Sequence, residues 1–198
     1  RILSSSAFAA LRDRLAETLE AGGRVVFSGC GATGRLSLLL EAAWREYWNR
    51  QAGASVSSDD TVRRFRDRVG GFMTGGDYAF IRSVEFFEDY EVFGARQVAE
   101  WALGPGDCLV GISEGGEASS VLGSVRAARD RGAAAVFVCN NPHELLSEHI
   151  ERSRRILTDP SILCLDCHTG PMALAGSTRM QATTVEWLVV GAALEDAI

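Results

Sequence analysis

The sequence predicts an α/β fold, a parallel sheet with helices on both faces, on two observations. Short apolar runs alternate along the chain with longer segments whose apolar residues recur at helical spacing. Clusters of Gly, Ser, Asn and Pro, the residues typical of turns, separate these segments. Continuous apolar strands that alternate with helices are typical of parallel sheets covered on both sides.

The first half of the chain begins with a helix that has clear start and stop signals. Residues 4–6 are three serines, which cap helices, and residues 22–23 are two glycines, which end them. The elements predicted up to residue 69 are a helix at 7–20, a strand at 24–27, a glycine-rich turn at 29–34, a helix at 36–48, a polar loop at 51–60 and a helix at 61–69. No second strand is predicted in this half.

The remaining strands come from the second half, in which Asp77 is a candidate N-cap and residues 104–107 (GPGD) form a strong turn. The elements predicted there are helices at 77–88, 90–103, 121–131, 144–150 and 178–194, and strands at 108–112, 133–138 and 162–165. Right-handed crossovers place the loops at 29–34, 113–120 and 140–143 at one edge of the sheet. We expect a ligand to bind at this edge.

Charge and composition exclude several classes of function. The 198 residues include 20 basic residues, all of them arginine, and 26 acidic residues, for a net charge of −6. Without lysine the chain has no Schiff-base residue and no lysine for a nucleotide phosphate loop. The acidic balance predicts neither a nucleic-acid nor a membrane partner, and no apolar run approaches the ~18 residues of a membrane span. The five cysteines, mostly in apolar runs, are typical of reduced thiols in a cytoplasmic protein.

Gly29-x-Gly31-x-x-Gly34 has the spacing of a dinucleotide-binding turn. Such a site also needs an acidic residue at the end of the next strand, about 20 residues on, and no strand is predicted there. The glycines could instead serve only a tight turn, or let backbone N–H groups approach another anion.

Residues 164–168 read Cys-x-x-Cys-His, the string of a haem attachment site or half of a zinc site. No second cysteine pair lies near, and the string begins inside a predicted strand. We therefore expect buried thiols here, and no metal or cofactor in the protein.

Hydroxyl residues gather at two predicted helix starts. Ser113, Ser119 and Ser120 accompany Gly115 and Gly116, and residues 176–179 read Gly-Ser-Thr-Arg. Hydroxyls, N–H groups and an arginine at helix starts suit a phosphate monoester, although each hydroxyl alone could be a helix cap.

Taken together, the motifs resemble the sugar isomerase (SIS) domain of the N-acetylmuramic acid 6-phosphate etherase and glucokinase regulatory protein family. The segments that carry the resemblance are 29–35 (GCGATGR), 75–77 (GGD), 84–89 (VEFFED), 111–113 (GIS), 169–171 (TGP) and 176–180 (GSTRM). The resemblance implies a doubly wound, flavodoxin-like αβα sandwich with a central five-stranded parallel sheet. It implies a SIS domain at 23–198 behind an N-terminal helix at 1–22, and a phosphorylated sugar as ligand.

The resemblance also assigns roles to residues. Glu88 matches the etherase glutamate that acts as base at sugar C2, whereas the etherase acid position is Ala43, with Glu46 as a substitute one helical turn on. The predicted substrate-binding residues, from the loops and the resemblance together, are Gly31, Thr33, Gly34, Ser113, Gly115, Ser119, Ser177, Thr178 and Arg179. Glu114 and Glu117 depart from the family pattern and would oppose a phosphate, and Gln181 replaces a family lysine.

Three functions remain open at this point. The Gly-Cys-Gly of the first loop favours a phosphosugar-binding protein similar to the regulatory protein. The alternatives are an etherase-type lyase that releases D-lactate, and an aldose–ketose isomerase that uses Glu88 with His143. The resemblance further implies a second SIS unit, either a dimer mate or a second domain, for which the apolar last helix offers a surface.

Overall fold

The computed structural model describes residues 1–54, 59–84 and 86–198. Its centre is a five-stranded, all-parallel sheet in the order β2-β1-β3-β4-β5. The strands are β1 (Val25–Gly29), β2 (Val69–Met73), β3 (Cys108–Ser113), β4 (Ala134–Cys139) and β5 (Ile162–Asp166). The helices are α1 (Ser6–Glu20), α2 (Gly31–Ala54), α3 (Asp59–Arg66), α4 (Gly76–Ile81), α5 (Glu91–Glu100), α6 (Ser119–Asp130), α7 (His143–His149), α8 (Glu151–Leu157) and α9 (Gln181–Glu195), with 3-10 turns η1 (Ile2–Ser4) and η2 (Phe87–Asp89).

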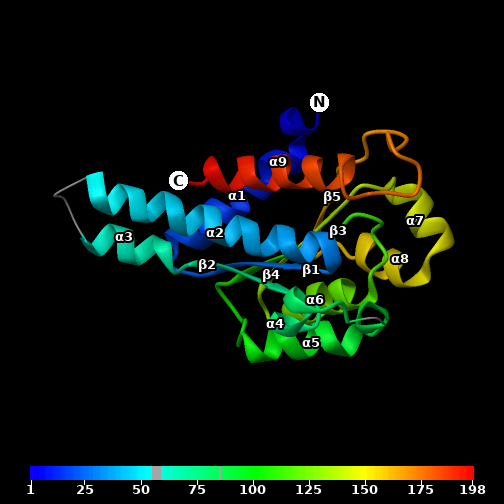
Figure 1. Ribbon diagram of the computed structural model, residues 1–198, viewed down its shortest axis with the longest axis horizontal. Helices are drawn as coiled ribbons and strands as arrows, with labels where there is room; N and C mark the ends of the chain where they lie inside the picture. Colours follow the sequence, from blue (N-terminus) through cyan, green and yellow to red (C-terminus); the bar gives the residue numbers. More distant parts are fainter. Residues whose placement is uncertain (55–58, 85) are drawn as a thin grey trace.

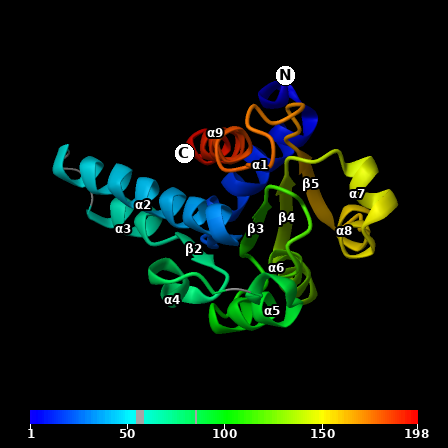
Figure 2. The same cartoon turned by 45° about the vertical axis from the view of Figure 1, so that its right-hand side comes forward.

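Helices cover both faces of this sheet, which confirms the predicted doubly wound αβα sandwich (Figure 1). One layer holds α1, α2 and α9, and the other holds α4, α5 and α6, as the turned view also shows (Figure 2). Each face has its own buried cluster, because the strands send apolar side chains to both sides. Phe27 and Val110 belong to the first cluster, and Leu109 and Phe137 to the second. Among the described residues, no helix is both long and apolar enough to cross a membrane.

The strand β2 was not predicted, and two glycines explain why. Its sequence, VGGFM, has weak strand propensity. A Cβ at Gly71 would lie 2.5 Å from the backbone oxygen of Ser37, so glycine lets α2 pack directly on this strand. The strand whose apparent absence counted against a dinucleotide site is therefore present, but the residue that follows it is Thr74, not an acid.

Several predicted boundaries were also wrong. The helix predicted at 36–48 extends over Gly31–Ala54, so the predicted loop at 51–60 is helical at both described ends, and its residues 55–58 lie outside the described residues. The helix predicted at 61–69 ends at Arg66, since the next segment enters β2. Asp77 lies inside α4, whose N-cap is Gly75 in a left-handed conformation. The last helix begins at Gln181, three residues later than predicted.

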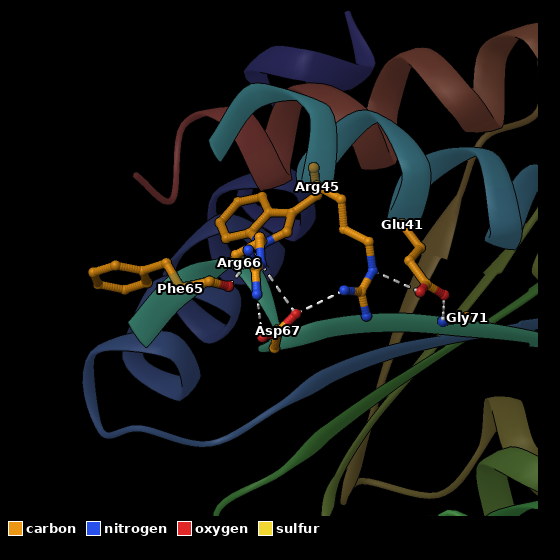
Figure 3. Close-up of polar contacts among 7 residues, drawn as sticks. Glu41, Arg45, Phe65, Arg66, Asp67 and Gly71 are labelled. Atoms are coloured by element: carbon orange, nitrogen blue, oxygen red, sulfur yellow. Dashed lines mark hydrogen bonds and ion pairs between the residues drawn. The ribbon is translucent and has the colours of Figure 1, made fainter. Parts of the chain in front are cut away.

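A polar cluster closes the free edge of β2 (Figure 3). Glu41 of α2 accepts the Gly71 N–H at 2.8 Å and the Arg45 Nε–H at 2.9 Å. Arg45 also pairs with Asp67 at 2.7 Å, and Arg66 pairs with the same carboxylate at 3.1 Å. Hydrogen bonding from Arg66 lowers the pKa of Asp67 below its usual value. The Glu41 carboxylate thus occupies a backbone N–H that an exposed edge strand would offer to another chain.

Candidate functional site

The candidate site is the edge of the sheet where the parallel strands end. The strand order reverses direction between β1 and β3, and open α/β sheets bind ligands at such a switch point. The register pairs Gly29, the last residue of β1, with Met73 of β2 and Ile112 of β3. The segments that leave these three strands therefore start side by side.

The first of these segments is shorter than predicted, because only Cys30 separates β1 from α2. The buried Thr33 hydroxyl accepts the Cys30 N–H at 3.0 Å and donates to the Cys30 carbonyl at 2.9 Å. Gly34 is required by packing, since a Cβ there would lie 2.5 Å from Met73 Cβ. Gly31, with φ +56°, has open space beyond its Cβ position at the start of a 24-residue helix. The N–H groups of this helix start are available to an anion, whereas the Thr33 hydroxyl is already engaged.

Glu88 reaches this first segment from 58 residues away. It lies on the 3-10 turn η2, which follows Phe86, a non-glycine residue at φ +68°. The Cys30 Sγ donates to Glu88 Oε2 at 3.4 Å, and burial together with the Glu88 charge raises the pKa of Cys30 to about 12. The thiol therefore stays protonated and holds the exposed carboxylate beside the start of α2. Glu85 of the same motif lies outside the described residues.

The segment after β3 brings the second set of predicted residues to the same edge. Ser113 is buried, and its carbonyl accepts the Gly116 N–H at 2.9 Å, which makes a tight turn. Gly115 is half-buried in this turn, and Ser119 begins α6. The turn and the first residues of α6 thus offer N–H groups and hydroxyls next to those of α2.

Ser120 has a structural task in this segment. Its hydroxyl lies 2.7 Å from Thr74 Oγ1, and both side chains are buried. Thr74 N–H donates to the Gly29 carbonyl at 2.9 Å. These contacts join the ends of β1 and β2 to the start of α6, so that the two helix starts keep a fixed separation.

The negative charge of Glu117, which would oppose a phosphate, is paired with an arginine. Arg152 of α8 donates to the Glu117 carbonyl at 2.7 Å and lies 3.2 Å from its carboxylate. An arginine outside the loop therefore balances the acid that the sequence places inside it.

The third group of predicted residues precedes α9 instead of beginning it. Ser177 is half-buried, while Thr178 and Arg179 are exposed. The Thr178 carbonyl accepts the Thr183 N–H at 3.2 Å, just ahead of Met180, the N-cap of α9. Gln181 holds this segment closed, since it donates to Thr169 Oγ1 at 3.0 Å and accepts the Ala173 N–H at 3.1 Å.

The candidate acid positions on α2 are not brought to this edge. Ala43 and Glu46 are exposed, and Glu46 pairs with Arg50 at 2.8 Å. Since Glu46 lies 15 residues beyond Gly31, it is about 22 Å along α2 from the site. His143 begins α7, and its Nε2 atom is buried with no partner among the described residues.

The side chains of the Cys-x-x-Cys-His string lie in separate surroundings. Cys167 is buried, Cys164 Sγ points to the Ile156 and Ile162 carbonyls, and His168 Nδ1 lies 3.1 Å from the Asn140 carbonyl. Within the described part of the chain, no three His, Cys, Asp or Glu side chains gather as metal ligands would.

Sequence reasoning missed one acid, Glu186 on α9. It is completely buried, and neither carboxylate oxygen has a hydrogen-bond partner among the described residues. Burial, and next the charge of Glu114, raises its pKa well above the usual value, although the amide of Asn140 opposes the shift. The signal was available, because Glu186 is the only charged residue between Arg179 and Glu195.

Residues 8–129 match the family described as the glucokinase regulatory protein N-terminal SIS domain. The chain belongs to this SIS family. Two relatives are the N-acetylmuramic acid 6-phosphate etherases of Cutibacterium acnes, 33% identical over 93% of this chain and 52% of that protein, and of Rubrobacter xylanophilus, 32% identical over 92% and 52%. The SIS chain therefore spans about half the length of these relatives.

Solved structures support the same fold. A phosphoheptose isomerase from Francisella tularensis covers 96% of the SIS chain and 84% of its own, with a TM-score of 0.61 and 17% identity. One from Neisseria gonorrhoeae covers 99% and 86%, with a TM-score of 0.57 and 14% identity. At these identities the likeness concerns the fold alone.

Proposed function

We propose that this SIS chain binds a phosphorylated sugar at the carboxyl edge of β1 and β3. The observation that carries the proposal is the meeting of two helix starts, those of α2 and α6, at the switch point of the sheet. Both helix starts direct N–H groups to the same region, and their partial positive charge attracts a phosphate. The names of the relatives and of the structural neighbours, which act on sugar phosphates, agree with this ligand class.

The residues would divide between the two ends of the ligand. The phosphate would take N–H groups and hydroxyls of five residues: Gly31, Gly34, Ser113, Gly115 and Ser119. Thr33 would support the first turn through its two bonds to Cys30. Ser177, Thr178 and the exposed Arg179 would close on the ligand from the α9 side, where a guanidinium can pair with phosphate oxygens. Glu88 would face the sugar hydroxyls.

The etherase reaction is the second candidate, and the contact between Cys30 and Glu88 favours it. A base that removes the proton at sugar C2 must lie beside the ligand, and Cys30 Sγ holds Glu88 at 3.4 Å next to the proposed phosphate loop. The lyase also needs an acid for the departing ether oxygen, and neither Ala43 nor Glu46 lies at this edge. The isomerase alternative would instead pair Glu88 with His143.

We also propose a second SIS unit as a partner. Its support is a groove of about 310 Å³ between α2 and α9, lined by Leu40, Trp44, Tyr47, Trp187, Leu188 and Ile198 among others. Trp187 is 45% and Leu188 56% exposed, and large apolar surfaces of this kind usually become covered in an assembly.

The five cysteines are free thiols, which supports a reducing compartment such as the cytoplasm.

The test is thermal shift and product analysis with two ligands, fructose 6-phosphate and N-acetylmuramic acid 6-phosphate. Binding predicts a rise in melting temperature with either ester and none with unphosphorylated fructose. Released D-lactate that Glu88→Gln abolishes, but the neighbouring control Asp89→Asn does not, would establish the etherase. Interconversion of sugars without lactate would favour the isomerase. If neither ester shifts the melting temperature, the proposed function is wrong.

A further inference from the structure

Asn140, which directly follows β4, joins the turn after β3 to the helix α9. Its N–H donates to the Glu114 carbonyl of that turn at 3.0 Å. Its Nδ2 donates to the Ala182 carbonyl of α9 at 3.3 Å. The side chain of the next residue, Asn141, donates to the Gly115 carbonyl at 3.0 Å. These two asparagines therefore support the proposed phosphate turn, and the Asn140 amide fixes that support to α9.

The carboxyl group of Glu186 lies beside this amide. Glu186 is four residues beyond Ala182 on α9, and an α-helical carbonyl accepts the N–H of the fourth residue on. The Asn140 amide and the Glu186 backbone thus share the Ala182 carbonyl as acceptor. Helical side chains lean towards the N-terminus of their helix, which directs the Glu186 carboxyl back over this turn. Hydrogen bonding from the Asn140 amide acts on the pKa of Glu186, in agreement with this placement.

Three oxygen atoms of these two side chains are buried without a partner among the described residues. They are both carboxyl oxygens of Glu186, which is 0% exposed, and Oδ1 of Asn140, which is 3% exposed. If Glu186 were ionised, all three would be acceptors without a donor, which is unfavourable in a protein interior. The Nδ2 donor of the same amide is already engaged with Ala182. One proton on Glu186 would supply a donor and remove the buried charge at the same time.

The surroundings of Glu186 favour the protonated form. Burial raises its pKa well above the usual value, the charge of Glu114 raises it further, and no arginine is among the groups that shift it. Cys139 and Cys167 are thiols whose pKa values are also raised, mainly by burial, with Asp166 and Glu186 acting in the same direction. Glu186 is therefore a neutral carboxylic acid in the folded chain.

We propose that the carboxylic-acid O–H of Glu186 donates to Asn140 Oδ1, and that Glu186 is thereby a positioning residue for the phosphate turn. The bond fixes the Asn140 side chain between β4 and α9. The Asn140 N–H then holds the Glu114 carbonyl, and with it the turn that would receive the phosphate. The positioning role rests on the proposed function, since it takes this turn as the phosphate site. Glu186 stays neutral throughout, so ligand binding moves no proton at this residue.

The hydrogen bond itself is tested without a ligand. The infrared spectrum of the full chain at neutral pH should contain a protonated carboxylic-acid C=O band that Glu186→Gln removes and Glu195→Gln leaves. Glu195 is the matched control, because it ends the same helix and is exposed. In Asn140→Leu the band should move to higher frequency, since the O–H loses its acceptor. Absence of the band, or an unchanged frequency in Asn140→Leu, would overturn the inference.

The positioning role is tested by the affinity for fructose 6-phosphate, from calorimetric titration at pH 7.5. Glu186→Gln keeps an N–H donor for Asn140 Oδ1, so its dissociation constant should stay within about twofold of that of the unsubstituted chain. Glu186→Met has a similar length but no donor, and its dissociation constant should rise about tenfold, the effect of one lost hydrogen bond. Asn140→Leu, which keeps the backbone bond to Glu114, should have the same effect. Glu186→Met added to Asn140→Leu should then change nothing further.

The outcomes separate this inference from the proposed function. Urea denaturation checks that each variant folds, and Asn140→Leu with Glu186→Gln decides the matter if Glu186→Met does not. Equal affinity of the unsubstituted chain and the variants without the bond would overturn the positioning role and leave the phosphosugar site intact. Equal losses in Glu186→Gln and the variants without the bond would also overturn it, because glutamine supplies the donor. Absence of binding by the unsubstituted chain would overturn the proposed function, while the infrared band would still decide the hydrogen bond.

Discussion

Glu41 and Glu186 lie in the same helical layer but in opposite surroundings. Glu41 on α2 accepts from both Gly71 N–H and Arg45, at the solvent-facing edge of β2. Glu186 on α9 is fully buried at the carboxyl edge of the sheet and has no partner for either oxygen among the described residues. The first carboxylate completes the edge of the fold. The second is costly to the fold, and buried acids of that kind concentrate at functional sites.

The largest loss of stability is expected from a substitution at Gly71, whose N–H donates to Glu41. Gly71→Ala would place a Cβ 2.5 Å from the Ser37 oxygen and push α2 away from β2, at a cost of roughly 3 kcal/mol of unfolding free energy. Gly104→Ala is the control, since its Cβ would meet nothing nearer than Arg131 O at 3.9 Å. Urea denaturation measures both variants. Equal stability of the two variants would mean that α2 does not need this close approach.

The next largest loss of stability is expected from removal of the Glu41 carboxylate. Glu41→Ala leaves the Gly71 N–H without its acceptor and Arg45 with only Asp67, which should cost about 1–3 kcal/mol. Glu41→Gln keeps an acceptor for the Gly71 N–H but loses the ion pair with Arg45. Its unfolding free energy should therefore lie between those of the unsubstituted chain and Glu41→Ala. If the two variants lose the same amount, the hydrogen bond to Gly71 contributes nothing.

Substitution of Glu186 should raise the free energy of unfolding, whereas substitution of Glu41 lowers it. Because its folded pKa is raised, its contribution to stability is fully present below the unfolded value near 4.5 and is lost as the pH rises towards the folded value. Glu186→Gln does not titrate, so its advantage over the unsubstituted chain should be near zero at pH 4. The advantage should then grow by up to about 1.4 kcal/mol per pH unit until the folded pKa is passed. Melting temperatures measured across this pH range test the sign, and a destabilised Glu186→Gln at pH 8 would contradict it.

The sequence predicts most of the fold and part of the candidate site. Apolar runs such as the one at 108–112 predict the central strands, because a strand buried on both faces needs little else. β2 was missed, since Gly70 and Gly71 exist for the approach of Trp101 and α2, contacts that only the folded chain reveals. The edge loops followed from topology, which is why Ser113 could be named, whereas Glu88 was named from the family resemblance. Glu186 was passed over, although it is the only charged residue between Arg179 and Glu195. Its lack of hydrogen-bond partners among the described residues becomes visible only in the folded chain.

The smallest loss of stability is expected from substitution of Glu46. Unlike Glu41 it does not bond to an edge strand, and unlike Glu186 it is not buried. Its side chain is 58% exposed and pairs with Arg50, which is 76% exposed, so solvent screens the attraction and Glu46→Ala should cost no more than about 0.5 kcal/mol. The substitution should also leave phosphosugar binding and any lactate release unchanged, because Glu46 lies far along α2 from the switch point. Urea denaturation and the lactate assay on this variant measure both expectations. Loss of turnover without loss of stability would return Glu46 to the role of the acid.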